Sequence, residues 1–208
     1  MEKTLFDQMN RHICLYILFS LLTGATVGIL TVIGQAYLPG ELNSLANLGP
    51  VWLLPAFFVS AVGDRVWKGM ITGWLSLSGM VGGYYWFESV WNQHAFGVGR
   101  WMLTWLVIAI VAGAIFGTAG YLWRHRDHRC HRVGSALLAG VFLTDGINML
   151  IHYASYSHMI AVPIVEIVIG ALTILLLERD KRERLRSYAA LIPIVVLGLI
   201  GYAILFTL

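Results

Sequence analysis

Two acidic side chains, Asp145 and Glu166, lie in stretches of sequence that are otherwise apolar enough for a lipid bilayer. A charge near the centre of a bilayer costs roughly 3 kcal/mol on insertion scales, so an acid at that depth needs water, a partner or a proton. No lysine or arginine occurs within these apolar stretches to neutralise the acids. This pattern favours a functional site over the alternative, a protonated structural hydrogen bond.

Two further polar residues share a helical stripe with the first acid. Asp145, Asn148 and His152 are spaced i, i+3 and i+7, which places them on one face of a helix. Glu166, counted inward from the same end of the next apolar stretch, lies at the same depth as Asp145, about 12 Å below that end. The two acids are therefore expected to be neighbours, with His152 as a local cation or a ligand-contacting imidazole.

Polar and aromatic residues from two earlier stretches are expected to join this site. Glu88 shares a stripe with Tyr84 and Trp91, and Gln35 lies in the corresponding half of the first stretch. Hydration of Glu88 at the interface and an interfacial aromatic belt that includes Trp91 are the alternatives. Because these polar residues all fall in one half of the membrane, they predict a pocket open on that side rather than a pore.

Carboxylates surrounded by tyrosine and tryptophan are suited to a small cation or a flat cationic heterocycle. The carboxylates supply charge, and the aromatic faces add cation–π and stacking terms of about 1–2 kcal/mol each when desolvated. No HExxH or Gly-x-Ser-x-Gly string is present, so no catalytic residue, resident metal or cofactor is expected. The ligand is predicted to be a small-molecule solute.

One loop holds residues that can ligate a metal. His125, His128, Cys130 and His131 lie within "RHRDHRCHR", without a second ligand pair of zinc-finger type. A basic loop facing lipid headgroups is the favoured interpretation.

Composition shows which kind of structure must position these residues. The chain has 208 residues, of which 58% are hydrophobic and 12% charged, which is typical of an integral membrane protein. Its net charge of +3 comes from short basic runs between apolar segments, a pattern that implies the lipid bilayer and not nucleic acid as its partner. We expect an all-α, polytopic membrane helix bundle forming a single domain over residues 1–208.

Apolar runs long enough to cross a bilayer predict six to seven transmembrane helices, and seven is the preferred count. The second run contains Pro50 and Pro55, which predict a kinked, short or partly re-entrant segment. The predicted spans are 13–37, 46–63, 69–91, 100–123, 134–153, 159–178 and 187–208.

Basic residues predict the orientation of these spans. Thirteen of the fourteen lysines and arginines, all except Arg100, fall before the first span or in alternate connections. The positive-inside rule then places the N-terminus in the cytoplasm, the C-terminus outside and the candidate pocket on the outer side of the cell (inner) membrane.

Glycines recur at four-residue spacing within the spans, as in Gly24/Gly28 and Gly79/Gly83. Small residues at this spacing let helix backbones approach closely. Packing within the bundle is favoured over the alternative, a docking surface for another membrane protein.

The stretch "SLLTGATVGIL", together with an outward pocket rich in Trp, Tyr and carboxylates, resembles the substrate-binding S components of energy-coupling-factor vitamin transporters. That resemblance implies a six-helix fold and a coupling subunit that docks on the Gly24/Gly28 face. Glycine replaces the alanine usual in that motif, and the seventh span departs from the fold. Separately, "LPGELNSLANLGPVW" resembles a segment of a family of uncharacterised bacterial integral membrane proteins.

Three classes of function follow from these observations. A protein that binds or transports a small solute is favoured, because of the outward polar cluster. A membrane assembly protein with structural acids is the first alternative. The second is an intramembrane metal-dependent hydrolase that uses His94, His152, Glu88, Asp145 and Glu166.

Overall fold

The computed structural model describes residues 13–125, 127–178 and 180–207, and these contain helices but no strand. The all-α prediction is therefore confirmed. In chain order the elements are α2 (Ile13–Tyr37), η1 (Gly40–Asn47), α3 (Gly49–Ser60), α4 (Val66–Trp91), α5 (Arg100–Arg124), α6 (His128–Ile151), α7 (Tyr153–Tyr156), η2 (Ser157–Met159), α8 (Ala161–Leu177) and α9 (Lys181–Thr207).

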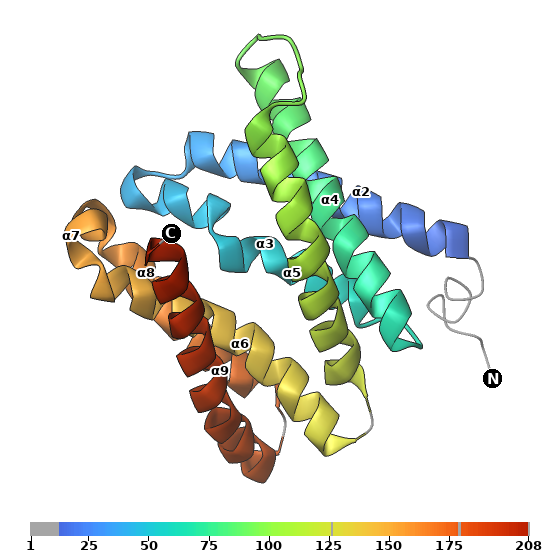
Figure 1. The fold of residues 1–208 in the computed structure, drawn as a ribbon, viewed down its shortest axis with the longest axis vertical. Coiled ribbons are helices and arrows are strands. Elements are labelled where there is room, and N and C mark those ends of the chain that lie inside the picture. The colour runs from blue at the N-terminus through green and yellow to red at the C-terminus, as the bar shows by residue number, and fades with distance from the viewer. Residues whose placement is uncertain (1–12, 126, 179, 208) are drawn as a thin grey trace.

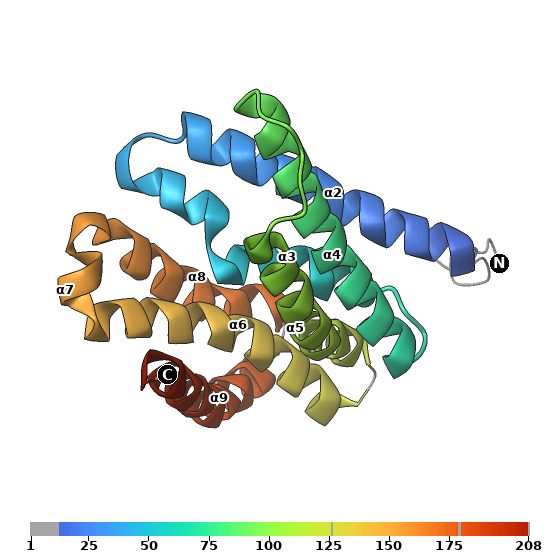
Figure 2. The same ribbon diagram turned by 45° about the horizontal axis from the view of Figure 1, so that its top comes forward.

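The helices form two groups of three. In the first group α4 packs between α2 and α5, and in the second α6 packs against both α8 and α9. The α5–α6 contact joins the groups, and α3 lies across the junction, packed on α4 and α5 and touching α6 (Figures 1 and 2). Phe57 of α3 and Phe142 of α6 are fully buried together at this junction.

The length and the apolar composition of the helices are those of a membrane protein. Four of them, α2, α5, α6 and α9, are individually long and apolar enough to cross a bilayer. Two bent pairs raise the count to six if each pair is one span: η1 with α3, bent by 41°, and the α7–η2 segment with α8, bent by 92°. The α3 helix has only 12 residues and includes Pro55, so the second predicted span is short and bent.

The preferred count of seven spans is not supported by this criterion, and the reason lies in α4. This helix has 26 residues and a length of about 39 Å, but its Gly, Ser, Trp and Tyr residues make it less apolar than the helices that count as spans. Because α2 and α5 cover it on two sides, less of its surface needs to be apolar. Four to six spans are shown, and a seventh crossing by α4 stays a prediction.

Glycine contacts bring α2 and α4 together. A Cβ atom added to Gly24 would lie 1.9 Å from the Ser76 carbonyl oxygen, and one on Gly28 would lie 2.2 Å from that of Met80. A Cβ atom added to Gly79 or Gly83 of α4 would likewise lie 2.4 Å from a carbonyl oxygen of α2. The Gly24/Gly28 face, predicted as a possible docking surface for a coupling subunit, is therefore covered by α4, and packing within the bundle accounts for both glycines.

A second set of glycines joins α4 to α5. A Cβ atom on Gly73 would lie 2.2 Å from the Gly113 carbonyl oxygen, and one on Gly117 would lie 2.1 Å from that of Gly69. Both faces of α4 thus depend on residues without side chains.

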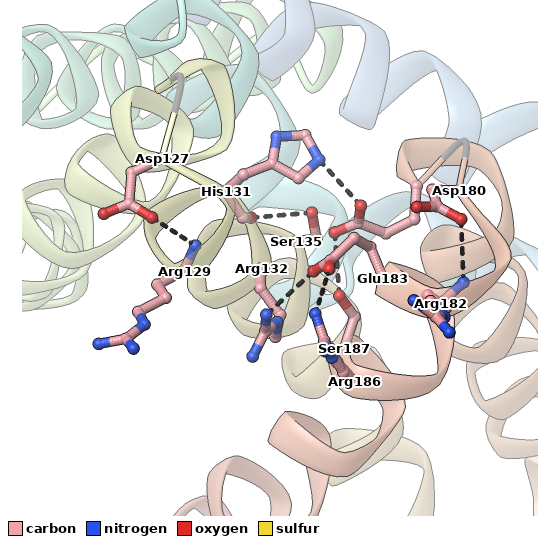
Figure 3. Close-up of polar contacts among 11 residues, drawn as sticks. Asp127, Arg129, His131, Arg132, Ser135, Asp180, Arg182, Glu183, Arg186 and Ser187 are labelled. Atoms are coloured by element: carbon pink, nitrogen blue, oxygen red, sulfur yellow. Dashed lines mark hydrogen bonds and ion pairs between the residues drawn. The ribbon is translucent and has the colours of Figure 1, made fainter.

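Polar contacts tie together the ends of α6, α8 and α9. The nearly buried Glu178 carboxylate lies 3.1 Å from His131 Nε2 and accepts a hydrogen bond of 2.9 Å from the Ser187 hydroxyl. Figure 3 shows the adjacent Glu183 beside Arg132 and Arg186, which it contacts at 2.9 and 2.7 Å.

The predicted membrane sides are consistent with the arrangement of helix ends. In Figure 1 one set of helix ends lies to the right and bottom. It consists of the start of α2, the end of α5, and the end of α8 with the start of α9. A second set of ends lies to the left and top. It consists of the α2–η1 connection, α7 and the end of α9 on the left, and the α4–α5 connection at the top. Basic residues such as Arg65 and Arg132 belong to the first set of ends, whereas Arg100 belongs to the second.

Labelling with an impermeant thiol reagent tests the orientation. With the free cysteines Cys14 and Cys130 replaced by alanine, Asn43→Cys and Ser157→Cys should label on intact cells, because both positions lie in predicted outer segments. Asp64→Cys should label only after lysis. The reverse pattern would show that the orientation is inverted.

Adjacent glycines of α4 offer a matched test of the packing. Gly83→Ala should lower the free energy of unfolding by about 1–3 kcal/mol, because its Cβ would lie 2.4 Å from the Ala25 carbonyl oxygen. Gly82→Ala meets no heavy atom within 4 Å and should be neutral or stabilising by up to about 1 kcal/mol. Unfolding in detergent measures both, and equal effects would contradict the packing.

Candidate functional site

The acids Asp145 and Glu166 lie side by side where α6 crosses α8. Close approach of the two backbones makes this possible, since a Cβ on Gly146 would lie 2.7 Å from the Pro163 carbonyl oxygen and 3.2 Å from Glu166 Cβ. Glu166 is fully buried, and the Asp145 carboxyl group is the nearest ionisable group acting on it. Neither Glu166 oxygen accepts a hydrogen bond from any donor among the described residues.

A tyrosine from the last helix completes this cluster. The Tyr202 hydroxyl donates a hydrogen bond of 2.6 Å to Asp145 Oδ1, and the ring also lies near Glu166 and Tyr156. Sequence reasoning missed Tyr202, because nothing in the apolar α9 sequence indicates which of its faces meets α6. We call Asp145, Glu166 and Tyr202 the acid cluster.

A polar cavity of about 300 Å³ opens beside Asp145. Its polar lining includes Gln35 from α2, Ser44 and Asn47 from η1, and Tyr156 from α7. The Glu41 carboxylate accepts a hydrogen bond of 3.0 Å from the Ala161 N–H, which ties η1 to the start of α8. This bond helps to hold η1 where Ser44 and Asn47 line the cavity together with Asp145.

An aromatic cavity of about 420 Å³ adjoins the polar one. Tyr202 and Asn47 connect the two, because Tyr202 lines the aromatic cavity while its hydroxyl binds Asp145, and Asn47 lines both. Trp52 stands at the centre of the aromatic wall, with ring centroids 5.6 Å from Tyr84 and 6.3 Å from Trp105. The six aromatic residues of the lining are Trp52, Tyr84, Tyr85, Trp101, Trp105 and Tyr202.

No lysine or arginine lines either cavity within the described part of the chain. The site therefore has negative and aromatic groups without a protein cation. Two of the lining residues, Trp101 and Trp105 of α5, are 65% and 45% exposed.

Four of the eight candidate residues meet around these cavities. Asp145 and Glu166 are in contact, Gln35 lines the polar cavity with Asp145, and Tyr84 lines the aromatic cavity with its hydroxyl beside Gln35. Candidate residues from α2, α4, α6 and α8 therefore converge here. The cavities are also lined by residues that the sequence did not indicate, from η1, α3, α5, α7 and α9.

The other four candidate residues line neither cavity and do not belong to the acid cluster. Asn148 is buried one turn beyond Asp145. His152 is the C-cap of α6, with its Nδ1 3.0 Å from the Asn148 carbonyl oxygen. Trp91 is 44% exposed and packs edge-on against Tyr37. None of these side chains lines either cavity.

Glu88 belongs to a separate cluster at the end of α4. It accepts a hydrogen bond of 2.6 Å from Asn92 and lies 3.1 Å from His94 Nε2. The Ala95 carbonyl, followed by the Glu88 carboxylate, raises the pKa of His94.

Metal ligation has no geometric support in the part of the chain that is described. No group of three or more His, Cys, Asp or Glu side chains there is arranged to hold an ion. The residues of the hydrolase alternative are divided between the Glu88–His94 pair, the end of α6 and the acid cluster.

A protein-family model with the description "Family of unknown function (DUF6518)" matches residues 7–208. The chain belongs to this family. No curated protein and no solved structure matches the chain. These comparisons agree with the predicted membership of an uncharacterised family and give no support to the resemblance to S components.

Removing the Tyr202 hydroxyl tests the acid cluster. Tyr202→Phe should lower the free energy of unfolding by about 1–2 kcal/mol, because Asp145 loses its donor in a partly buried site. Tyr153→Phe, at a side chain that is 50% exposed on α7, is the matched control and should change little. Equal effects in thermal unfolding would argue against the hydrogen bond.

Proposed function

We propose that this protein of the cell (inner) membrane binds a small aromatic organic cation from the outer side, as a solute-binding or transport protein. The observation that carries the proposal is the junction of an aromatic cavity with an acid cluster, where no lysine or arginine of the described residues lines either cavity. A ligand that is both flat and positively charged satisfies both halves of this site.

The aromatic cavity suits the flat part of such a ligand. Its volume of about 420 Å³ lies within the range of small-molecule sites. Ring faces at Trp52, Tyr84 and Trp105 provide stacking and cation–π contacts, each worth about 1–2 kcal/mol when desolvated.

The acid cluster suits the charged part. Asp145 lines the polar cavity, so its carboxylate can be reached by a charged group, whereas Glu166 lies fully buried behind it. An ion pair formed here is shielded from water and is stronger than one on the protein surface. Asp145 is accordingly the ligand's counter-ion in this proposal.

An energy-coupling-factor S component is a special case of this proposal. A coupling subunit would then have to dock elsewhere than on Gly24 and Gly28, since α4 covers both.

Thermal unfolding of the purified protein with matched ligands tests the proposal. N-methylquinolinium should stabilise the fold by about 2.7 kcal/mol at a hundred times its dissociation constant. The neutral methylnaphthalene has nearly the same shape and should stabilise much less, because it gains no interaction with Asp145.

Two pairs of variants locate the binding site. Asp145→Asn should abolish stabilisation by the cation while Glu88→Gln, an acid outside both cavities, keeps it. Trp52→Leu should weaken binding about tenfold, as expected for a contact worth 1–2 kcal/mol, while Trp91→Leu leaves it unchanged. If no aromatic cation stabilises the wild type, or if Asp145→Asn raises stability without affecting binding, the acids are structural and the assembly class is favoured.

A further inference from the structure

The polar cavity beside the acid cluster is lined mainly by side chains that carry oxygen, whereas the ring faces line the adjoining cavity. Its five polar residues are Gln35, Ser44, Asn47, Asp145 and Tyr156. Each of them has an oxygen atom that can accept a hydrogen bond. This cavity is therefore suited to a ligand group that brings several hydrogen-bond donors.

Asp145 provides the charged acceptor of this set. Its Oδ1 accepts the Tyr202 hydroxyl at 2.6 Å, which leaves Oδ2 for a donor in the polar cavity that Asp145 lines. A hydrogen bond from a positively charged N–H group to a carboxylate is about twice as strong as one between neutral groups. A cation with N–H donors thus gains more at Asp145 than the attraction of the two charges.

Asn47 provides a neutral acceptor at the junction of the two cavities. Its side chain is exposed, and it is part of the lining of both the polar and the aromatic cavity. A ligand that extends from one cavity into the other passes beside this amide. A donor held by Asp145 on the polar side is then within the same cavity as the Asn47 carbonyl oxygen.

The η1 helix holds Asn47 in place before any ligand binds. A Cβ atom added to Gly34 of α2 would lie 2.7 Å from Ala46 Cβ, so α2 and η1 are in close contact directly beside Asn47. The hydrogen bond from the Ala161 N–H to the Glu41 carboxylate ties η1 to α8 as well. An acceptor that is already positioned loses less entropy when the ligand binds.

A cation without N–H donors fits this arrangement poorly. Quaternary ammonium groups are bound in cages of aromatic rings, and the ring faces here, such as Trp52 and Trp105, line the other cavity. In the polar cavity a quaternary group would displace water from oxygen atoms without replacing the hydrogen bonds of that water. A primary ammonium group has three donors and replaces them.

We infer that the ligand is an arylalkylamine, with a flat ring in the aromatic cavity and a primary ammonium group in the polar cavity. Asp145 binds the charge, and the Asn47 carbonyl oxygen accepts a second N–H, which makes Asn47 a specificity-determining residue. The alkyl chain between ring and nitrogen is short, because Asn47 and the Tyr202 side chain already connect the two cavities. The inference rests on the proposed function and adds where the ligand carries its charge and which donors it brings.

Two cations that differ only in their N–H donors test the inference. Tryptamine and N,N,N-trimethyltryptammonium share the ring, the chain and a single positive charge at pH 7. In calorimetric titration of the purified wild-type protein, tryptamine should bind about tenfold more tightly, as expected for one additional hydrogen bond. Equal or tighter binding of the trimethyl compound would overturn the inference, and this comparison does not depend on whether a variant folds.

Matched variants identify the residue that recognises the donors. Asn47→Leu should weaken tryptamine binding about tenfold and leave the trimethyl compound largely unaffected, so the difference between the two ligands disappears. Trp52→Leu should weaken both ligands by the same factor, because it removes only a ring contact. Asn92→Leu, at an amide that binds Glu88 outside both cavities, should change neither affinity. If Asn47→Leu weakens both ligands alike or neither of them, Asn47 does not determine specificity and the inference is wrong.

The outcomes separate the inference from the proposed function. If N-methylquinolinium and the trimethyl compound bind as tightly as tryptamine, the requirement for N–H donors is overturned and the proposed function stands. If none of the three cations binds the wild type, both the inference and the proposed function are overturned.

Discussion

Close approach of helix backbones at glycine residues is the contact on which the rest of this molecule depends. In a bilayer, helices gain little from burying apolar side chains, because lipid is equally apolar, so van der Waals contact between backbones has to hold them together. Gly24 and Gly28 bring α2 against α4, and Gly73 brings α5 against the other side of α4. At Gly146 the same kind of contact joins α6 to α8 and brings Asp145 and Glu166 together. Packing and candidate chemistry therefore rely on the same feature.

The two groups of three helices leave space where they meet. Large aromatic side chains such as Trp52 and Trp105 fill this junction incompletely, and the cavity between them reaches the acid cluster through Tyr202. An apolar core without a function would be expected to close such a space, since protein interiors are densely packed. The combination of an open aromatic cavity with an uncompensated acid is typical of sites that bind a charged ligand.

Polar interactions at the opposite ends of the helices have a different role. Glu178 is satisfied by His131 and Ser187. Glu183 is paired with Arg132 and Arg186 (Figure 3), so the charges of both acids are compensated. This contrast strengthens the case for the acid cluster. Basic side chains neutralise acids at one end of the bundle, whereas no lysine or arginine among the described residues lines the cavity beside Asp145.

By itself the sequence determined the helical class, the positions of the helices, the membrane environment and the shared depth of the two acids. Each of these follows from local composition or from the 3.6-residue period of a helix, which are properties of one segment at a time. Only the tertiary structure decided which helix faces meet. It brought Tyr202 to Asp145, covered Gly24 with α4, and left Glu88 and Trp91 outside the cavities. The spacing of residues along one helix contains no information about the rotation of that helix against its neighbours, which is set by the close contacts that pack them together.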